Sequence, residues 1–218
     1  MSQSLIETLP APQRLALAYA PARAKPRTLV LFALEARLAQ AVRQASEPIM
    51  AQMRLAWWRD QLALPVVKRE NSDALAASLT LFEGEEIALQ ALVDGWEVLL
   101  SEWMDLAAVE RIAAGRAAGF AALARLSGAD HAVDDALRAG RRFALADLAT
   151  KFSNSGERAQ VLALAGAERG QGIALPRALR SLAVLDGLAR RSIAKGGAPL
   201  LDGPASALAA IRLGLVGR

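Results

Sequence analysis

The chain has 218 residues, of which 54% are hydrophobic and 22% charged, so it can build a large core and does not resemble a disordered protein. Its formal net charge of +4 comes from arginines dispersed along the chain, without the basic blocks and interleaved aromatic residues of a nucleic-acid-binding protein. The chain contains no cysteine, which excludes disulfides, thiolate catalysis and cysteine metal sites.

The amino-terminal segment MSQSLIETLPAPQR lacks the basic region and apolar run of a signal peptide. No apolar stretch approaches the roughly 18 residues that a membrane-spanning helix needs. We therefore expect a cytoplasmic protein that touches a membrane, if at all, from one side.

Alanine and leucine recur in every segment and β-branched runs are nearly absent, which favours helices over strands. Apolar residues at helical spacing predict about nine helices, most of them 10 to 20 residues long. The segments with this pattern begin at Pro12 and continue at 28–44, 48–62, 74–82, 85–103, 106–126, 132–152, 158–167, 176–194 and 205–216. We find no repeat and no domain boundary, so residues 1–218 are expected to form one all-α helical bundle.

Local residues mark several of the expected helix ends. Asp73 or Ser72 can cap the helix at 74–82, and Asp130 can cap the helix that begins at Ala132. Gly84 and Gly128 are expected to end the helices before them.

The helix at 48–62, PIMAQMRLAWWRDQL, has the most unusual composition in the chain. Ser46 can cap it, and proline is tolerated in a first turn. Two apolar faces are expected on it, one with Ile49, Met53, Ala56 and Trp57 and the other with Leu55, Trp58 and Leu62. We expect this helix to be buried between neighbours on two sides, with its aromatic residues filling the core.

Two clusters of acids have spacings that a metal could use. Asp130, Asp134 and Asp135 surround His131, and Glu83, Glu85 and Glu86 surround Gly84. Both clusters start helices, where acids favour the helix dipole and the cap, so we interpret them as helix-start residues. Trp96 and Trp103 are interpreted as core residues rather than as a ligand platform. Gly115 and Gly119, four residues apart, fit close helix packing as well as a cavity-lining helix.

Four segments together resemble a known family: LVLFALEARLAQAVR at 29–43, MRLAWWRDQL at 53–62, AAGRAAGFAAL at 113–123 and IALPRALRSL at 173–182. They occur in the same order as in the squalene/phytoene synthase family of head-to-head prenyltransferases, which this chain resembles. The most specific element is Trp58-Arg59-x-x-Leu62, one helix after Phe32-Ala33-Leu34, which looks like the family's Tyr-Ala-Phe segment. The resemblance implies an all-α, isoprenoid synthase-like fold, in which Mg²⁺ held by two aspartate-rich motifs assists the joining of two isoprenyl diphosphates.

The aspartate-rich motifs of that family are not matched here. The resemblance places the first motif at Ala39, Gln40 and Arg43, none of which is a carboxylate that Mg²⁺ would prefer. The second motif is expected on the helix at 132–152, where Asp147 stands alone. The resemblance therefore implies a catalytically degenerate member without a cofactor, similar to the subgroup that includes a mitochondrial complex I assembly factor.

A degenerate member could keep the family's apolar cavity, with arginines replacing the metal as its positive lining. Such a cavity would bind an isoprenoid, a lipid or an apolar segment of a protein partner. The residues that the resemblance and the charge pattern place around it are Phe32, Arg37, Arg43, Trp57, Arg59, Gly115, Gly119 and Phe120.

Two alternatives remain open at the level of the sequence. One is an active prenyltransferase of terpenoid or carotenoid biosynthesis whose Mg²⁺ is held by Asp130, Asp134, Asp135 and Asp147. The other is a helical adaptor with a filled core and no cavity.

Overall fold

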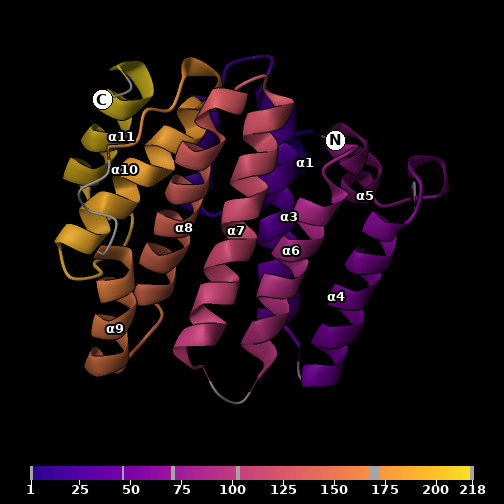
Figure 1. Cartoon of the computed structure of the whole chain (residues 1–218), viewed down its shortest axis with the longest axis horizontal. Coiled ribbons are helices and arrows are strands. Elements are labelled where there is room, and N and C mark those ends of the chain that lie inside the picture. Colours follow the sequence, from indigo (N-terminus) through magenta and orange to yellow (C-terminus); the bar gives the residue numbers. More distant parts are fainter. Residues whose placement is uncertain (1, 46, 70–71, 102–103, 167–171, 217–218) are drawn as a thin grey trace.

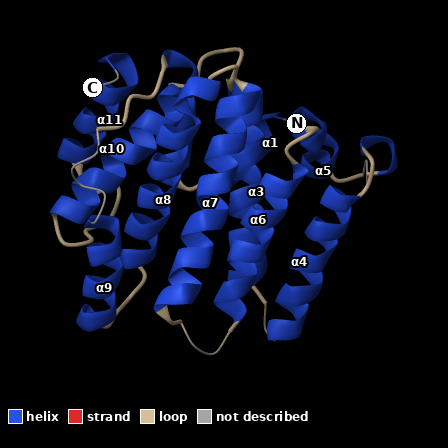
Figure 2. Cartoon of the chain, in the orientation of Figure 1, coloured by secondary structure: helices blue, strands red, loops and turns tan. Residues whose placement is uncertain are grey.

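A computed structural model describes residues 2–45, 47–69, 72–101, 104–166 and 172–216, which contain eleven α-helices (Figure 1). Figure 2 shows helices and loops, and no strand, in these ranges. The α-helices are α1 (Ser2–Thr8), α2 (Ala11–Ala18), α3 (Lys25–Arg43), α4 (Pro48–Ala63), α5 (Ala74–Ser78), α6 (Glu86–Glu97), α7 (Leu106–Leu126), α8 (Val133–Ala149), α9 (Ser155–Gly166), α10 (Arg180–Ala194) and α11 (Pro204–Val216). Short 3-10 turns lie at Val66–Lys68, Leu79–Phe82, Val98–Leu100, Asp130–Ala132 and Arg177–Leu179. The expected all-α class is confirmed.

Several helix ends follow the local signals in the sequence. The Asp73 carboxylate accepts hydrogen bonds from the backbone N–H groups of Leu75 at 2.8 Å and Ala76 at 3.0 Å, as expected of a cap. Gly84 and Gly128 have φ values of 86° and 68°, in the left-handed region that glycine adopts without strain.

Other helix ends differ from expectation. Helix α1 was not predicted, and α3 begins at Lys25 because Pro26 fits in its first turn. Asp130 does not cap: it lies in the 3-10 turn before α8, whereas Asp134 and Asp135 lie in the first turn of α8. Three residues with a predicted role lie outside the described residues. They are Ser46, expected to cap a helix, and Trp103 and Ala167, expected to lie in helices.

The helices pack side by side in an order that follows the chain. Helices α4, α6, α7, α8, α10 and α11 contact one another in that order, and α9 packs against α8. In Figure 1, α4 and α11 lie at opposite edges of this row, and α3 lies behind α6 and α7. Helix α3 also contacts α1, α2, α4, α5 and α7, so it is the central helix of the arrangement.

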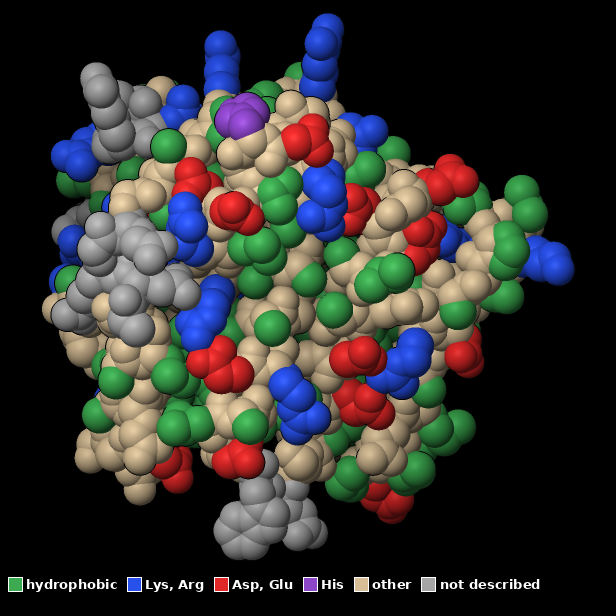
Figure 3. All heavy atoms as spheres, in the orientation of Figure 1, with side chains coloured by type: hydrophobic (Ala, Val, Ile, Leu, Met, Phe, Trp, Pro, Cys, Tyr) green, Lys and Arg blue, Asp and Glu red, His purple; other side chains and the backbone are tan. Residues whose placement is uncertain are grey.

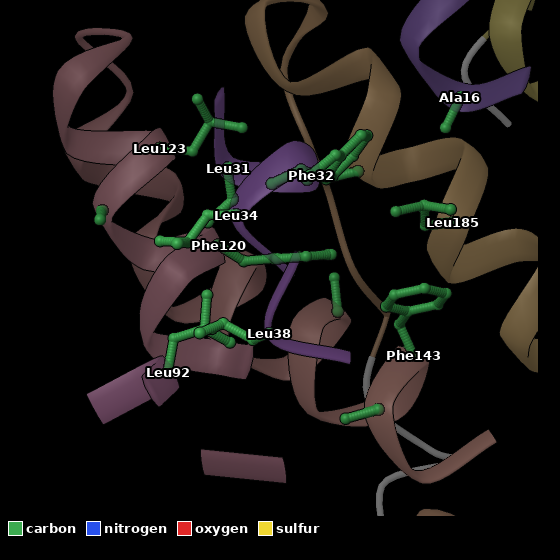
Figure 4. Close-up of a cluster of buried hydrophobic side chains, with 14 of the residues drawn as sticks. Ala16, Leu31, Phe32, Leu34, Leu38, Leu92, Phe120, Leu123, Phe143 and Leu185 are labelled. Atoms are coloured by element: carbon green, nitrogen blue, oxygen red, sulfur yellow. The ribbon is translucent and has the colours of Figure 1, made fainter. Parts of the chain in front are cut away.

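The core is mainly apolar and surrounds α3. Phe32, Leu34 and Leu38 of α3 are fully buried, and Figure 4 shows them among side chains from the neighbouring helices. Phe120 of α7 and Phe143 of α8 stack with ring centroids 6.0 Å apart. Their stacking fills the space between α7 and α8, and a closely packed interior of this kind leaves few voids.

Helix α4 is not buried on two sides. Leu55, Trp58 and Leu62 pack into the protein, but the other apolar face is open to solvent, with Met53 62% exposed and Trp57 37% exposed. The reason is position: α4 packs on α3 and α6 and forms one edge of the row, so no helix covers its second face. The sequence-based expectation for this helix was therefore wrong.

The described helices include none that is both long enough and apolar enough to cross a membrane.

Candidate functional site

A groove of about 500 Å³ lies between α3 and α4, beside the end of α1. Its walls combine cationic, amide and aromatic side chains, and no acid is among them. The lining residues are Thr8, Arg37, Gln40, Ala41, Gln44, Arg54, Trp57 and Trp58.

The two tryptophans have different roles in this groove. Their rings meet edge to face, with centroids 4.7 Å apart and planes at 80°. Trp58 is only 3% exposed and packs in the core, whereas Trp57 is on the open side. Because edge-to-face contact is a favourable geometry for aromatic rings, the buried Trp58 holds the Trp57 ring at the groove.

Two arginines give the groove its positive charge. Arg37 Nη1 donates to Asp73 Oδ2 at 3.1 Å, so part of its charge is already balanced. Burial alone would raise the pKa of Asp73, but the backbone donors of Ala76 and Leu75, together with Arg37, lower it below its ordinary value. Arg54 is exposed and has no acidic partner among the described residues, so its guanidinium is available to an anion.

Arg59, which the resemblance placed in a cavity, ties α4 to α6 instead. Its Nη2 donates to Asp94 Oδ1 at 2.5 Å and to Glu97 Oε2 at 2.6 Å. The hydrogen bonds that Arg59 donates to Asp94 and Glu97 raise its pKa above the ordinary value. Arg43 is exposed near the end of α3 and does not line the groove.

The residues expected around one cavity lie in different environments. Arg37 and Trp57 line the groove, whereas Phe32 and Phe120 are in the hydrophobic core. The structure therefore brings together only part of the expected lining, at the surface between α3 and α4.

Gly115 and Gly119 allow close helix packing. A Cβ atom on Gly115 would lie 2.4 Å from the Ala91 carbonyl oxygen of α6, and one on Gly119 would lie 2.9 Å from Leu31 Cδ1 of α3. Only glycine permits the backbones of α6 and α7 to approach this closely. Of the two interpretations of this motif, packing explains Gly115.

A buried charge network lies where α3, α7 and α8 meet. Arg116 Nε donates to Glu35 Oε1, and Arg116 Nη1 donates to Asp147 Oδ2 at 2.9 Å. The guanidinium also lies over the Phe143 ring, 4.6 Å from its centroid, and 5.8 Å from that of Trp96. Burial would lower the pKa of Arg116, but attraction to Glu35 and Asp147 outweighs it and raises the pKa. Asp147, the lone acid of the expected second motif, is thus bound by an arginine.

Sequence reasoning did not single out Arg116 or Glu35. Glu35 lies on α3 among leucines that are buried, and Arg116 lies beside Gly115 on an otherwise apolar part of α7. The available signal was one charged residue within an apolar stretch of each helix, because buried charges are normally paired.

A second buried pair joins α8 to α10. Arg142 Nη1 donates to Asp186 Oδ1 at 2.6 Å, and Arg190 Nε lies 3.0 Å from the other Asp186 oxygen. Burial raises the pKa of Asp186 in spite of these two arginines. The pair lies away from the groove, in the contact between the two helices.

The acids considered as metal ligands have protein partners or are exposed. Asp135 pairs with Arg138 and accepts a hydrogen bond from the Ala174 N–H at 3.0 Å, while Asp130 and Asp134 are exposed. Glu85 binds Arg125 and Glu86 binds Arg69, at 2.5 and 2.8 Å. Within the described ranges, no three histidine or acidic side chains form a group that could hold a metal ion.

The face formed by α6, α7 and α8 has charges of both signs. Figure 3 shows basic and acidic side chains interspersed across it. Two of the ion pairs that join neighbouring helices are Arg125–Glu85 and Arg141–Glu110, each with an N–O distance of 2.5 Å. The α3–α4 groove differs from this face because its lining has arginines without acids.

No family model, no curated protein and no solved structure matches this chain. The resemblance to the squalene/phytoene synthase family therefore stays an expectation that rests on the four quoted segments.

Proposed function

We propose that the protein is a squalene/phytoene synthase-like protein that binds an amphipathic ligand without transforming it. The ligand has an anionic head, as in an isoprenyl diphosphate or a lipid phosphate, and occupies the α3–α4 groove. The observation that supports this proposal is that Arg37, Arg54 and Trp57 border one groove whose lining contains no acid.

The groove has the chemistry to bind such a molecule. Its volume of about 500 Å³ is within the usual range for small-molecule sites. A guanidinium can donate two parallel hydrogen bonds to a phosphate, and Arg54 has no acid competing for it among the described residues. The head group is therefore expected at Arg54, with Arg37 adding charge from the opposite wall.

An apolar tail has a surface to follow beyond the groove. Ile49, Met53 and Trp57 are spaced four residues apart on α4, and all three are exposed. At 1.5 Å per residue the stripe from Trp57 to Ile49 is about 12 Å long. Burying this stripe against an isoprenoid or acyl chain would remove apolar surface from water on both molecules.

Turnover by the family's mechanism is not part of the proposal. The positions that the resemblance assigns to the first metal motif are Ala39, Gln40 and Arg43. Asp147, the only acid expected of the second motif, is hydrogen bonded to Arg116. Metal-assisted departure of diphosphate needs carboxylates that can bind the ion, and these residues do not supply them.

Calorimetric titration with a non-hydrolysable thio-analogue of farnesyl diphosphate tests the proposal, with short-chain phosphatidylglycerol below its micellar concentration as a second arm. We expect saturable binding of at least one of them, and the comparison identifies the source of the head group. Arg54→Gln should weaken binding roughly 10- to 100-fold, as expected for the loss of a charge-assisted hydrogen bond. Arg111→Gln, an exposed arginine on α7, is the matched control and should bind normally.

Two results would contradict the proposal. The first is that neither ligand shows saturable binding. The second is that both variants, Arg54→Gln and Trp57→Ala, bind like the unmodified protein. Release of diphosphate from farnesyl diphosphate with Mg²⁺ would instead favour the prenyltransferase alternative.

A further inference from the structure

The C-terminal helix α11 is apolar on its solvent side as well as on its packed side. Leu208 is 66% exposed and Leu215 is 72% exposed, with Ile211 exposed between them. Their spacing of three and four residues places them on one stripe, the α11 face. A helix that is hydrophobic all round is normally covered by something on each side.

The opposite side of α11 is fixed to the rest of the protein. Ala210 and Leu213 are buried, and α11 packs on α10 and α2. A Cβ atom on Gly187 of α10 would lie 2.0 Å from Leu213 Cδ1, and one on Gly214 of α11 would lie 2.2 Å from the Tyr19 ring. These contacts determine which residues of α11 point outward, so the α11 face is a fixed surface.

Arginines lie along one border of the α11 face. A groove of about 740 Å³ between α10 and α11 is lined by Arg190, Arg191 and Arg212, together with Leu208 and other apolar residues, and by no acid. Arg190 and Arg191 each contact one aspartate, whereas Arg212 is exposed without an acidic partner in the part of the chain that the structure describes. The surface therefore combines an apolar stripe with net positive charge.

We propose that the α11 face lies flat on an anionic lipid bilayer. Interfacial helices insert aliphatic side chains at the boundary between head groups and acyl chains, while their basic residues contact the anionic head groups. Leu208, Ile211 and Leu215 would supply the inserted stripe, and Arg212 and Arg190 the head-group contacts. No helix needs to cross the membrane for this mode of binding.

Charge decides between a bilayer and a second copy of the chain. Two copies joined through the α11 face would bring their Arg212 side chains toward each other, and the groove lining offers no acid to balance them. An anionic bilayer complements both the apolar stripe and the arginines. The surface is also distinct from the α3–α4 groove, because α11 and α4 lie at opposite edges of the molecule (Figure 1).

Vesicle co-sedimentation of the full chain tests the proposal. The two probes are vesicles of phosphatidylcholine alone and vesicles of phosphatidylcholine and phosphatidylglycerol in equal parts. We expect stronger binding to the anionic vesicles that weakens as salt is added. Leu208→Ser/Leu215→Ser should lower partitioning at least about tenfold, because both inserted side chains are lost. Arg212→Gln should lower it about fivefold on anionic vesicles and leave binding to phosphatidylcholine unchanged.

A matched control removes apolar side chains elsewhere. Val67 and Ile87 are also highly exposed, so Val67→Ser/Ile87→Ser should bind vesicles like the unmodified protein. In the calorimetric titration with the farnesyl diphosphate thio-analogue, Leu208→Ser/Leu215→Ser should bind like the unmodified protein, because neither residue lines the α3–α4 groove, and this separates the two proposals. Because every substituted residue is exposed, thermal unfolding of all variants should be unchanged.

Three outcomes would overturn the proposal. These are a lack of binding to anionic vesicles, equal binding by Leu208→Ser/Leu215→Ser, and a dimer in light scattering that this double variant abolishes. The last outcome would assign the α11 face to a second copy.

Discussion

Arg116 Nη1 donates a hydrogen bond of 2.9 Å to Asp147 Oδ2, in the region where the resemblance places the second metal-binding motif. The same guanidinium binds Glu35, so one cation on α7 joins acids from α3 and α8. The side chains of Arg116 and Glu35 are only 3% and 5% exposed. One buried arginine thus links three central helices, α3, α7 and α8.

We predict that Arg116→Met strongly destabilises the protein. The substitution fits the apolar surroundings, but it leaves the Glu35 carboxylate buried without its partner. Removing one member of a buried ion pair costs roughly 3–5 kcal/mol of the free energy of unfolding. Urea denaturation followed by far-ultraviolet circular dichroism measures this difference.

The control replaces both members of the pair. Glu35→Leu/Arg116→Met removes the buried Glu35 carboxylate together with its partner, and Asp147, whose side chain is 26% exposed, keeps Lys151 within 4.0 Å. Exchanging a buried pair for apolar residues is often neutral or stabilising. We therefore expect the double variant to be more stable than Arg116→Met alone. A double variant as unstable as the single one would show that the unpaired Glu35 is not the cause.

The helices were largely predictable because their ends are determined locally. The range expected for α7, 106–126, matches the structure, and α4 differs from expectation by one residue at its end. Asp73, Gly84 and Gly128 act through neighbouring backbone atoms, so their effects can be read from the sequence. Helix α1 was not predicted because its seven residues, with no acid in the first turn and no base in the last, are too few to show a helical period.

The site was much less predictable because it depends on which helices become neighbours. Trp57 and Trp58 are adjacent in sequence, yet the position of α4 at the edge of the row exposes one and buries the other. Arg37 and Arg59 were expected to line one cavity, but each is bound by a different acid on another part of the chain. These acids, Asp73 and Asp94, lie 36 and 35 residues further along the sequence. Such contacts follow from tertiary packing, which helical periodicity does not specify.

Gly115→Ala should destabilise the contact between α6 and α7. The added methyl group would lie 2.4 Å from a backbone oxygen of Ala91, which can move only if the helices separate. Overpacking of this kind costs about 1–3 kcal/mol. Gly119→Ala is the matched helical control, because its methyl group meets the movable Leu31 side chain and alanine favours the helix. Equal unfolding midpoints in urea for the two variants would argue against packing as the role of Gly115.

The two tryptophans should separate stability from binding. Trp58→Ala removes a buried ring and should lower the free energy of unfolding by roughly 3–5 kcal/mol. Trp57→Ala removes a partly exposed ring, so its stability should change by less than about 1 kcal/mol while binding in the groove weakens. Chemical unfolding and the calorimetric titration measure the two effects. Comparable destabilisation by both substitutions would mean that Trp57 is a core residue and not a ligand contact.

Asp73 should make stability depend on pH in the acidic range. Its pKa in the folded protein is lowered from the ordinary value of 3.8, so the folded state favours the ionised form. The stabilisation is therefore complete above that ordinary value and is lost as the pH falls through the lowered pKa.

Asp73→Ala, which also removes the cap of α5, should cost about 1 kcal/mol at neutral pH. Asp73→Asn keeps a capping oxygen and loses only the charge that pairs with Arg37, so it should cost less. Both differences, measured by urea denaturation at a series of pH values, should shrink toward acid, and a difference that grows there would contradict the lowered pKa.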